Sequence, residues 1–188
     1  MAAILEDGWL ESAERCPSPN CNERPTGKTI DLLVIHNISL PPGEFGGACI
    51  REFFCNTLDC DAHPYFEQLR GMEVSAHLLI ERSGEIVQFV PFDLRAWHAG
   101  QSCFEGRDNC NDFSIGIELE GTDEGPYTGA QYTSLAGVTK ALMQAYPGIT
   151  RERITGHSDI APGRKTDPGP AFDWRRYLDL LNGEESTV

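Results

Sequence analysis

Two short apolar segments constrain the fold more than any other feature of this sequence. Residues 31–36 (DLLVIH) form an apolar run with loop signals on both sides, which predicts a buried strand. Residues 114–120 (SIGIELE) alternate large apolar side chains with small or acidic ones, which predicts a half-buried strand. His36 closes the first segment, and the second carries Glu118 and Glu120 on the face opposite its apolar side chains. The two segments therefore predict a sheet with ionisable groups along it.

The other regular segments alternate between strands and helices. Residues 75–80 and 85–90 flank an Arg-Ser-Gly turn signal, which predicts a β-hairpin. Three helices are expected: a short amphipathic one at residues 49–54, one that begins at the capping box 128–131 and ends before Pro147, and a last one capped by Asp173. This order predicts a single α/β (α+β) domain over residues 1–188, with a mixed central β-sheet flanked by helices. We expect residues 1–28 to form a coil-rich wrap and residues 183–188 a flexible tail.

The charge balance excludes two classes of partner. Lysine and arginine number 15 against 29 aspartates and glutamates, so the formal net charge is −14. Binding to nucleic acid or to an anionic membrane needs basic residues that neutralise phosphate, and this chain has too few of them. No apolar run is long enough for a transmembrane span, and no basic residue precedes an apolar stretch at the N-terminus. We therefore expect neither a nucleic-acid nor a membrane partner.

The cysteine pattern indicates a reducing compartment. The chain has seven cysteines, an odd number, and none of them form a CxxC pair. Such a pattern disfavours both a disulfide framework and a cysteine-rich zinc ribbon. Scattered, reduced thiols are typical of cytoplasmic proteins, so the cytoplasm is the expected location.

Two of the five histidines stand at expected strand ends. His36 follows an apolar run and His157 follows Ile-Thr-Gly, so both side chains could project into one cleft, and Asp167 comes ten residues after His157. Two imidazoles and one carboxylate leave a fourth position free on a zinc ion, as hydrolytic sites require. The spacing alone does not decide for a metal site, because a histidine at a strand end is more often a satisfied core residue.

Five long strings of this sequence resemble one enzyme family. They are VIHNISLPPGEFGG at residues 34–47, SAHLLI at 75–80, RAWHAG at 95–100, CNDFSIGIELEGTD at 110–123 and GHSDIAPGRKTDPGP at 156–170. Together they resemble the AmpD-type zinc N-acetylmuramyl-L-alanine amidases, which cleave 1,6-anhydromuropeptides during cytoplasmic cell-wall recycling. Phage lysozyme-type amidases and peptidoglycan recognition proteins belong to the same wider family. The resemblance implies a mixed sheet flanked by helices, in agreement with the pattern of expected elements.

The resemblance also implies roles for five residues. His36, His157 and Asp167 are the implied ligands of one Zn²⁺ per chain, Glu118 the proton acceptor, and Lys165 the group that stabilises the transition state. Without the resemblance, Glu118 would be interpreted as part of a solvated strand face and Lys165 as a surface charge. The implied reaction is hydrolysis of the amide bond between the lactyl group of N-acetylmuramic acid and L-alanine of the stem peptide.

Four further residues are expected to contact the substrate: Asn37, Trp97, His98 and Arg107. Cleft-lining polar side chains of this kind usually orient ligands rather than react. We expect a monomer that acts on soluble muropeptides. Two alternatives remain open: a non-catalytic muropeptide-binding module, and an amidase that acts on polymeric peptidoglycan outside the cytoplasm. The complete set of implied metal and catalytic residues favours an enzyme over a binding module.

Overall fold

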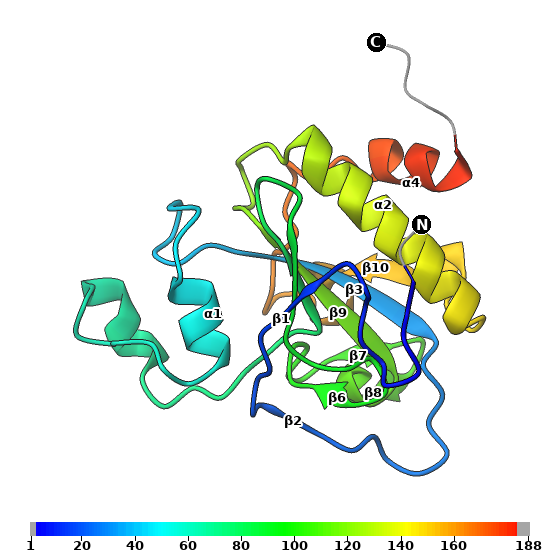
Figure 1. Cartoon of the computed structure of the whole chain (residues 1–188), viewed down its shortest axis with the longest axis horizontal. Helices are drawn as coiled ribbons and strands as arrows, with labels where there is room; N and C mark the ends of the chain where they lie inside the picture. Colours follow the sequence, from blue (N-terminus) through cyan, green and yellow to red (C-terminus); the bar gives the residue numbers. More distant parts are fainter. Residues whose placement is uncertain (1–2, 184–188) are drawn as a thin grey trace.

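Strands β3 (Leu32–Ile38) and β9 (Ser114–Glu120) form the centre of a six-stranded sheet in the computed structural model, which describes residues 3–183 (Figure 1). The strand order is β1-β5-β4-β9-β3-β10. β10 (Ile154–Gly156) and β9 both run parallel to β3, and β4 (Leu78–Ile80) runs parallel to β9. β5 (Ile86–Gln88) is antiparallel to β4, as the hairpin prediction requires. The predicted mixed sheet is confirmed.

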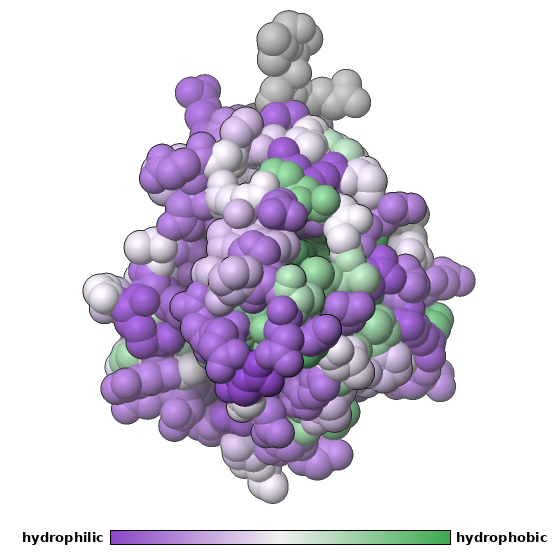
Figure 2. Space-filling view, turned by 90° about the vertical axis from the view of Figure 1, so that its left-hand side faces the viewer, coloured by the Kyte–Doolittle hydropathy of each residue, from purple (hydrophilic) through white to green (hydrophobic). Residues whose placement is uncertain are grey.

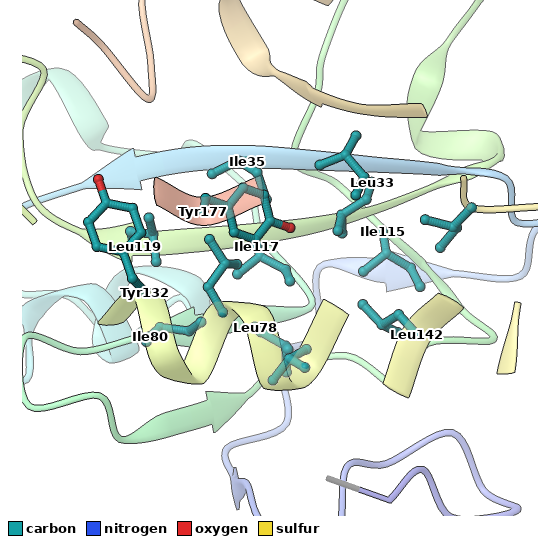
Figure 3. Packing of buried hydrophobic residues seen from close by; sticks show 14 of the residues in the cluster. Leu33, Ile35, Leu78, Ile80, Ile115, Ile117, Leu119, Tyr132, Leu142 and Tyr177 are labelled. Carbon is teal, nitrogen blue, oxygen red and sulfur yellow. The ribbon is translucent and has the colours of Figure 1, made fainter. Parts of the chain in front are cut away.

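Helices α2 (Gly129–Ala145) and α4 (Trp174–Asn182) cover one face of this sheet (Figure 1). The predicted capping box starts α2, because the Thr128 side chain accepts from the backbone N–H of Gln131 while the Gln131 side chain accepts from the N–H of Thr128. The side chain of Asp173 caps α4, also as predicted. Figure 3 shows alternate side chains of the central strands packed against α2, together with Tyr177 of α4. This packing is the main hydrophobic core.

The opposite face of the sheet is covered by shorter elements. α1 (Cys49–Phe54) matches the predicted short helix, and the 3₁₀ helix η1 (Pro64–Leu69) lies beside it (Figure 1). The remaining elements are brief: β1 (Glu14–Arg15), β2 (Cys21–Asn22), β6 (Arg95–Ala96), β7 (Cys103–Phe104), β8 (Arg107–Asp108), η2 (Cys110–Asp112), η3 (Arg151–Arg153) and α3 (His157–Ile160). No helix within residues 3–183 is long and apolar enough to cross a membrane.

Three predictions differ from the structure or lie partly outside the described residues. The expectation that β9 is half-buried is wrong, because all seven of its residues are buried, including Glu118 and Glu120. Other parts of the chain meet the second face of this strand: Gly116 packs against His98, and Glu120 accepts from the backbone of Gly46 and Arg82. The N-terminal wrap holds two short strands, of which β1 extends the sheet through β5. The predicted tail at residues 183–188 lies outside the described residues, apart from Gly183.

Candidate metal centre

Two histidines and one aspartate from distant parts of the chain converge at one end of the central strands. His36 lies on β3, His157 begins α3 directly after β10, and Asp167 lies in the loop that follows α3. Nδ1 of His36 is 2.9 Å from Nδ1 of His157 and 3.0 Å from Oδ2 of Asp167. Nδ1 of His157 is 3.0 Å from the same carboxylate oxygen. The structure therefore brings together the three predicted ligands, whose nearest donor atoms all lie within 4.8 Å of one another.

Strand pairing explains this convergence. β10 pairs in parallel with β3 as far as Gly156, so His157 follows directly beside His36. Gly156 also allows a close approach of the loop that carries Asp167, because a Cβ at this position would lie only 2.8 Å from Cδ of Pro168. The two histidines are thus placed by the sheet, and the aspartate is placed by a loop packed tightly against it.

The proton positions suit a divalent metal. Nε2 of His157 is 3.0 Å from the backbone oxygen of Ala99, which can only accept, so the proton of a neutral His157 lies on Nε2. Nδ1 of His157 then presents a lone pair to the cluster, and the carboxylate oxygen of Asp167 presents another. Neutral imidazole nitrogen and carboxylate oxygen are ligands that Zn²⁺ takes in sites with three protein ligands and one open position. The three residues fit a zinc ion.

Burial and hydrogen bonding set the charges of these ligands. Burial lowers the pKa of His36 to about 4, although the close contact with Asp167 opposes the shift. Burial alone would raise the pKa of Asp167, but its close contacts with the imidazoles of His157 and His36 outweigh burial and hold this pKa well below its usual range. At neutral pH His36 is therefore neutral and Asp167 is ionised. These are the protonation states that a metal ligand requires.

The two acidic residues of β9 have different surroundings. Both carboxylate oxygens of Glu120 accept from backbone amides, one from Gly46 and one from Arg82, so Glu120 anchors two loops. Glu118 is equally buried, but its Oε2 has no hydrogen-bond partner within residues 3–183. Burial, and then the charge of Asp167, raise the pKa of Glu118 well above its usual range. Glu118 is the acid whose oxygen remains available to a ligand.

A cavity of about 420 Å³ opens beside the cluster. Its polar lining includes residues predicted to do the chemistry: Glu118, His157, Lys165 and Asp167. Its apolar lining includes Leu40, Phe53, Tyr65 and Met72. Figure 2 shows the side of the molecule that lies at the left of Figure 1, where hydrophobic residues gather around a hollow among hydrophilic ones. The cavity could thus hold a ligand with both polar and apolar parts against Glu118 and Lys165.

Three of the four predicted substrate contacts line this cavity: Asn37, Trp97 and His98. The amide nitrogen of Asn37 donates to Asp123 and to the backbone oxygen of Pro168, and Nε1 of Trp97 donates to Asn22. Arg107 is not among the lining residues. Its guanidinium pairs with Asp31 at 2.9 Å and lies 3.9 Å from the ring centre of Phe113, so it is engaged away from the cavity.

Several supporting residues could not be identified from the sequence. The Tyr127 hydroxyl donates to the same Pro168 oxygen that Asn37 contacts, and so holds the loop next to Asp167. Ser114 contacts His98, and the side-chain oxygen of Asn111 accepts from the backbone of residues 98 and 99. These contacts join residues far apart in the chain, so no local motif marks them.

The chain was compared with protein-family models and with known proteins. Residues 26–170 match the family model described as N-acetylmuramoyl-L-alanine amidase. The 1,6-anhydro-N-acetylmuramyl-L-alanine amidase AmpD of Escherichia coli (strain K12) is 61% identical over 181 residues, which are 96% of this chain and 98% of that protein.

Solved structures show the same relationship. The crystal structure of a Se-Met AmpD derivative superposes with a TM-score of 0.92 at 60% identity and covers 95% of this chain and 99% of that one. The amidase AmiD from E. coli, solved in complex with the substrate anhydro-N-acetylmuramic acid-L-Ala-D-gamma-Glu-L-Lys, superposes with a TM-score of 0.59 at 28% identity, covering 95% and 65%. On this evidence the chain belongs to the N-acetylmuramoyl-L-alanine amidase family.

Proposed function

We propose that this protein hydrolyses the amide bond between 1,6-anhydro-N-acetylmuramic acid and L-alanine in soluble muropeptides, and that it uses one zinc ion to do so. The observation that carries the proposal is the convergence of His36, His157 and Asp167 beside a cavity whose lining includes His157, Asp167, Glu118 and Lys165. The names of relatives that match over nearly the whole chain support this choice of bond and sugar.

His36, His157 and Asp167 would hold the metal. A zinc ion bound there supplies Lewis-acid chemistry, since it polarises a carbonyl group and makes a water molecule easier to deprotonate. The fixed Nε2 proton of His157 and the ionised state of Asp167 mean that neither ligand has to reorganise to bind. The protein thus prepares the site before substrate arrives.

Glu118 and Lys165 carry the remaining steps of the proposed reaction. The free oxygen of Glu118 takes the proton of the attacking water and then returns it to the leaving amine of L-alanine. The ammonium of Lys165, which lines the same cavity, stabilises the negative charge that forms on the carbonyl oxygen. The charge of Lys165 also opposes the rise in the pKa of Glu118, and so favours the carboxylate form that a base needs.

We further propose that the protein acts as a cytoplasmic monomer without a nucleic-acid or membrane partner. The metal ligands, Glu118 and Lys165 all come from one chain, so the site needs no second copy. The net charge of −14 opposes binding to polyanions. The odd number of cysteines and the lack of any CxxC pair in the sequence are typical of a protein in a reducing compartment.

Product analysis by mass spectrometry tests the proposal. Zinc-loaded protein is incubated with 1,6-anhydro-N-acetylmuramyl-tripeptide and, separately, with polymeric peptidoglycan. We expect free tripeptide and the anhydro sugar from the first and much slower release of peptide from the second. Faster release from the polymer would show a wall-degrading amidase instead. Binding of the tripeptide substrate without any cleavage would show a binding module.

A further inference from the structure

The two histidine ligands are supported in different ways. His157 donates its Nε2 proton to a backbone carbonyl, that of Ala99, whose role as acceptor is fixed. Among residues 3–183, no backbone carbonyl accepts from His36. Its Nε2 lies 2.9 Å from Nδ1 of His98, and this imidazole can either donate or accept. The proton on His36 is therefore controlled by another side chain.

One arrangement of protons frees His36 for a metal. Nδ1 of His36 can present a lone pair to the cluster only if the ring proton sits on Nε2. That proton is then donated to Nδ1 of His98, so His98 must carry its own proton on Nε2. Nε2 of His98 lies 3.0 Å from Oγ of Ser114, a hydroxyl that can accept it. In this chain of hydrogen bonds, the Nε2 protons of His36 and His98 each have an acceptor, Nδ1 of His98 and Oγ of Ser114.

The fold holds His98 in this position. Gly116 lies between Ser114 and Glu118 on β9, and a Cβ there would lie 2.4 Å from Cγ of His98. The imidazole therefore occupies the space that a side chain on the central strand would fill. Both of its ring nitrogens contact other residues of the protein, so neither is left to hydrogen-bond a substrate, although the ring lines the cavity.

A single buried amide fixes the backbone at this point. Oδ1 of Asn111 accepts from the N–H groups of His98 and Ala99, at 3.2 and 2.8 Å. These two consecutive residues supply the acceptors for both histidine ligands, the imidazole for His36 and the carbonyl for His157. The orientation of both ligands thus depends on one short segment.

We infer that His98 is a positioning residue, which accepts the Nε2 proton of His36 and so keeps Nδ1 of His36 free to bind the metal. The inference rests on the proposed metal site and goes beyond it, since it assigns a role to a residue that the sequence suggested as a substrate contact. Partners that orient metal-bound histidines in this way typically contribute about 10- to 100-fold to metal affinity.

The test measures zinc affinity by competition with a chromophoric chelator. His98→Phe keeps a ring of similar shape without the acceptor, and His98→Asn restores an acceptor near the position of Nδ1. We expect His98→Phe to lose about 10- to 100-fold in zinc affinity and His98→Asn to recover most of that loss. Trp97→Phe is the matched control, because Trp97 adjoins His98 but its side-chain N–H donates to Asn22 rather than to a histidine; its zinc affinity should equal that of the wild type. Equal affinities for His98→Phe and wild type would overturn the inference.

A second measurement does not depend on a variant that folds. In the zinc-loaded wild type with ¹⁵N-labelled histidine, NMR should show the proton of His98 on Nε2 and an unprotonated Nδ1. A proton on Nδ1 would reverse the hydrogen bond and overturn the inference. If the wild-type protein binds no zinc at all, the proposed metal site fails instead, so the two failures are distinguishable.

Discussion

His36 and Glu118 are direct partners in the parallel pairing of β3 and β9. This register places one metal ligand and the proposed base on adjacent strands. Their neighbours Ile35 and Ile117 pack toward α2 (Figure 3), and side chains alternate along a strand, so His36 and Glu118 lie on the opposite face. The backbone of the two central strands thus sets their separation, and neither residue depends on a mobile loop. Sites built on regular elements hold their geometry more closely than sites built on loops.

Glu118→Gln tests whether Glu118 acts as the base. The amide keeps the size of the side chain but cannot accept a proton from water, so we expect kcat to fall by about 10²- to 10⁴-fold. Zinc content should be unchanged, since Glu118 is not among the three proposed ligands. Steady-state kinetics with metal analysis checks both expectations.

Glu120→Gln is the matched control on the same strand. Its carboxylate accepts from the backbone of Gly46 and Arg82, so the substitution should lower the free energy of unfolding by about 1 to 3 kcal/mol through these two contacts. Its loss in kcat should be far smaller than that of Glu118→Gln. Comparable losses in kcat for the two variants would contradict the assignment of Glu118 as the base.

Gly116→Ala tests the space that the central strand leaves for His98. The added Cβ would lie 2.4 Å from Cγ of His98, so the ring must move away from His36. We expect weaker zinc binding together with a lower thermal midpoint. Gly137→Ala in α2 is the control, because its Cβ would meet nothing within 4 Å. Alanine in a helix interior should instead raise the free energy of unfolding by about 0.5 to 1 kcal/mol. If both variants lowered the zinc affinity equally, displacement of His98 could not explain the effect of Gly116→Ala.

The stability of the zinc-free protein should depend on pH through its buried histidines. Burial, and then the nearby Arg24, lower the pKa of His77 to about 3, while the unfolded chain titrates near 6.5. Between these values the unfolded state binds more protons, so the contribution of His77 is complete above pH 6.5 and is lost as pH falls toward 3. Each such histidine contributes a slope of about 1.4 kcal/mol per pH unit within its window.

Urea unfolding of the zinc-free protein at several pH values measures this slope. His77→Gln should make it shallower than that of the wild type. If the free energy of unfolding of His77→Gln changed with pH as steeply as that of the wild type, this buried imidazole would not control acid sensitivity.

Much of the fold could be predicted because its signals are local. The apolar run at 31–36, the alternation at 114–120 and the capping box at 128–131 each identify an element that the structure contains. The full burial of β9 could not be predicted in this way. A strand that carries two glutamates has the pattern of a solvent-facing strand, and its burial depends on segments that cover it from elsewhere in the chain.

The same distinction between local signals and long-range contacts applies to the site. The resemblance to a known family suggested His36, His157 and Asp167, and the structure brings them together. The contact between His36 and His98 spans 62 positions in the chain, and that between Arg107 and Asp31 spans 76. No pattern in the sequence predicts which basic or imidazole side chain will face the cavity and which will pair with a distant carboxylate or ligand.

We have proposed that amide hydrolysis by this protein depends on a zinc ion held by His36, His157 and Asp167. The most direct measurement follows tripeptide release from 1,6-anhydro-N-acetylmuramyl-tripeptide by protein stripped of metal, before and after titration with zinc. We expect no release from stripped protein, and full activity when about one zinc per chain has been added, as for a single site with three protein ligands. Release at the full rate from protein that metal analysis shows to be free of zinc would contradict this proposal.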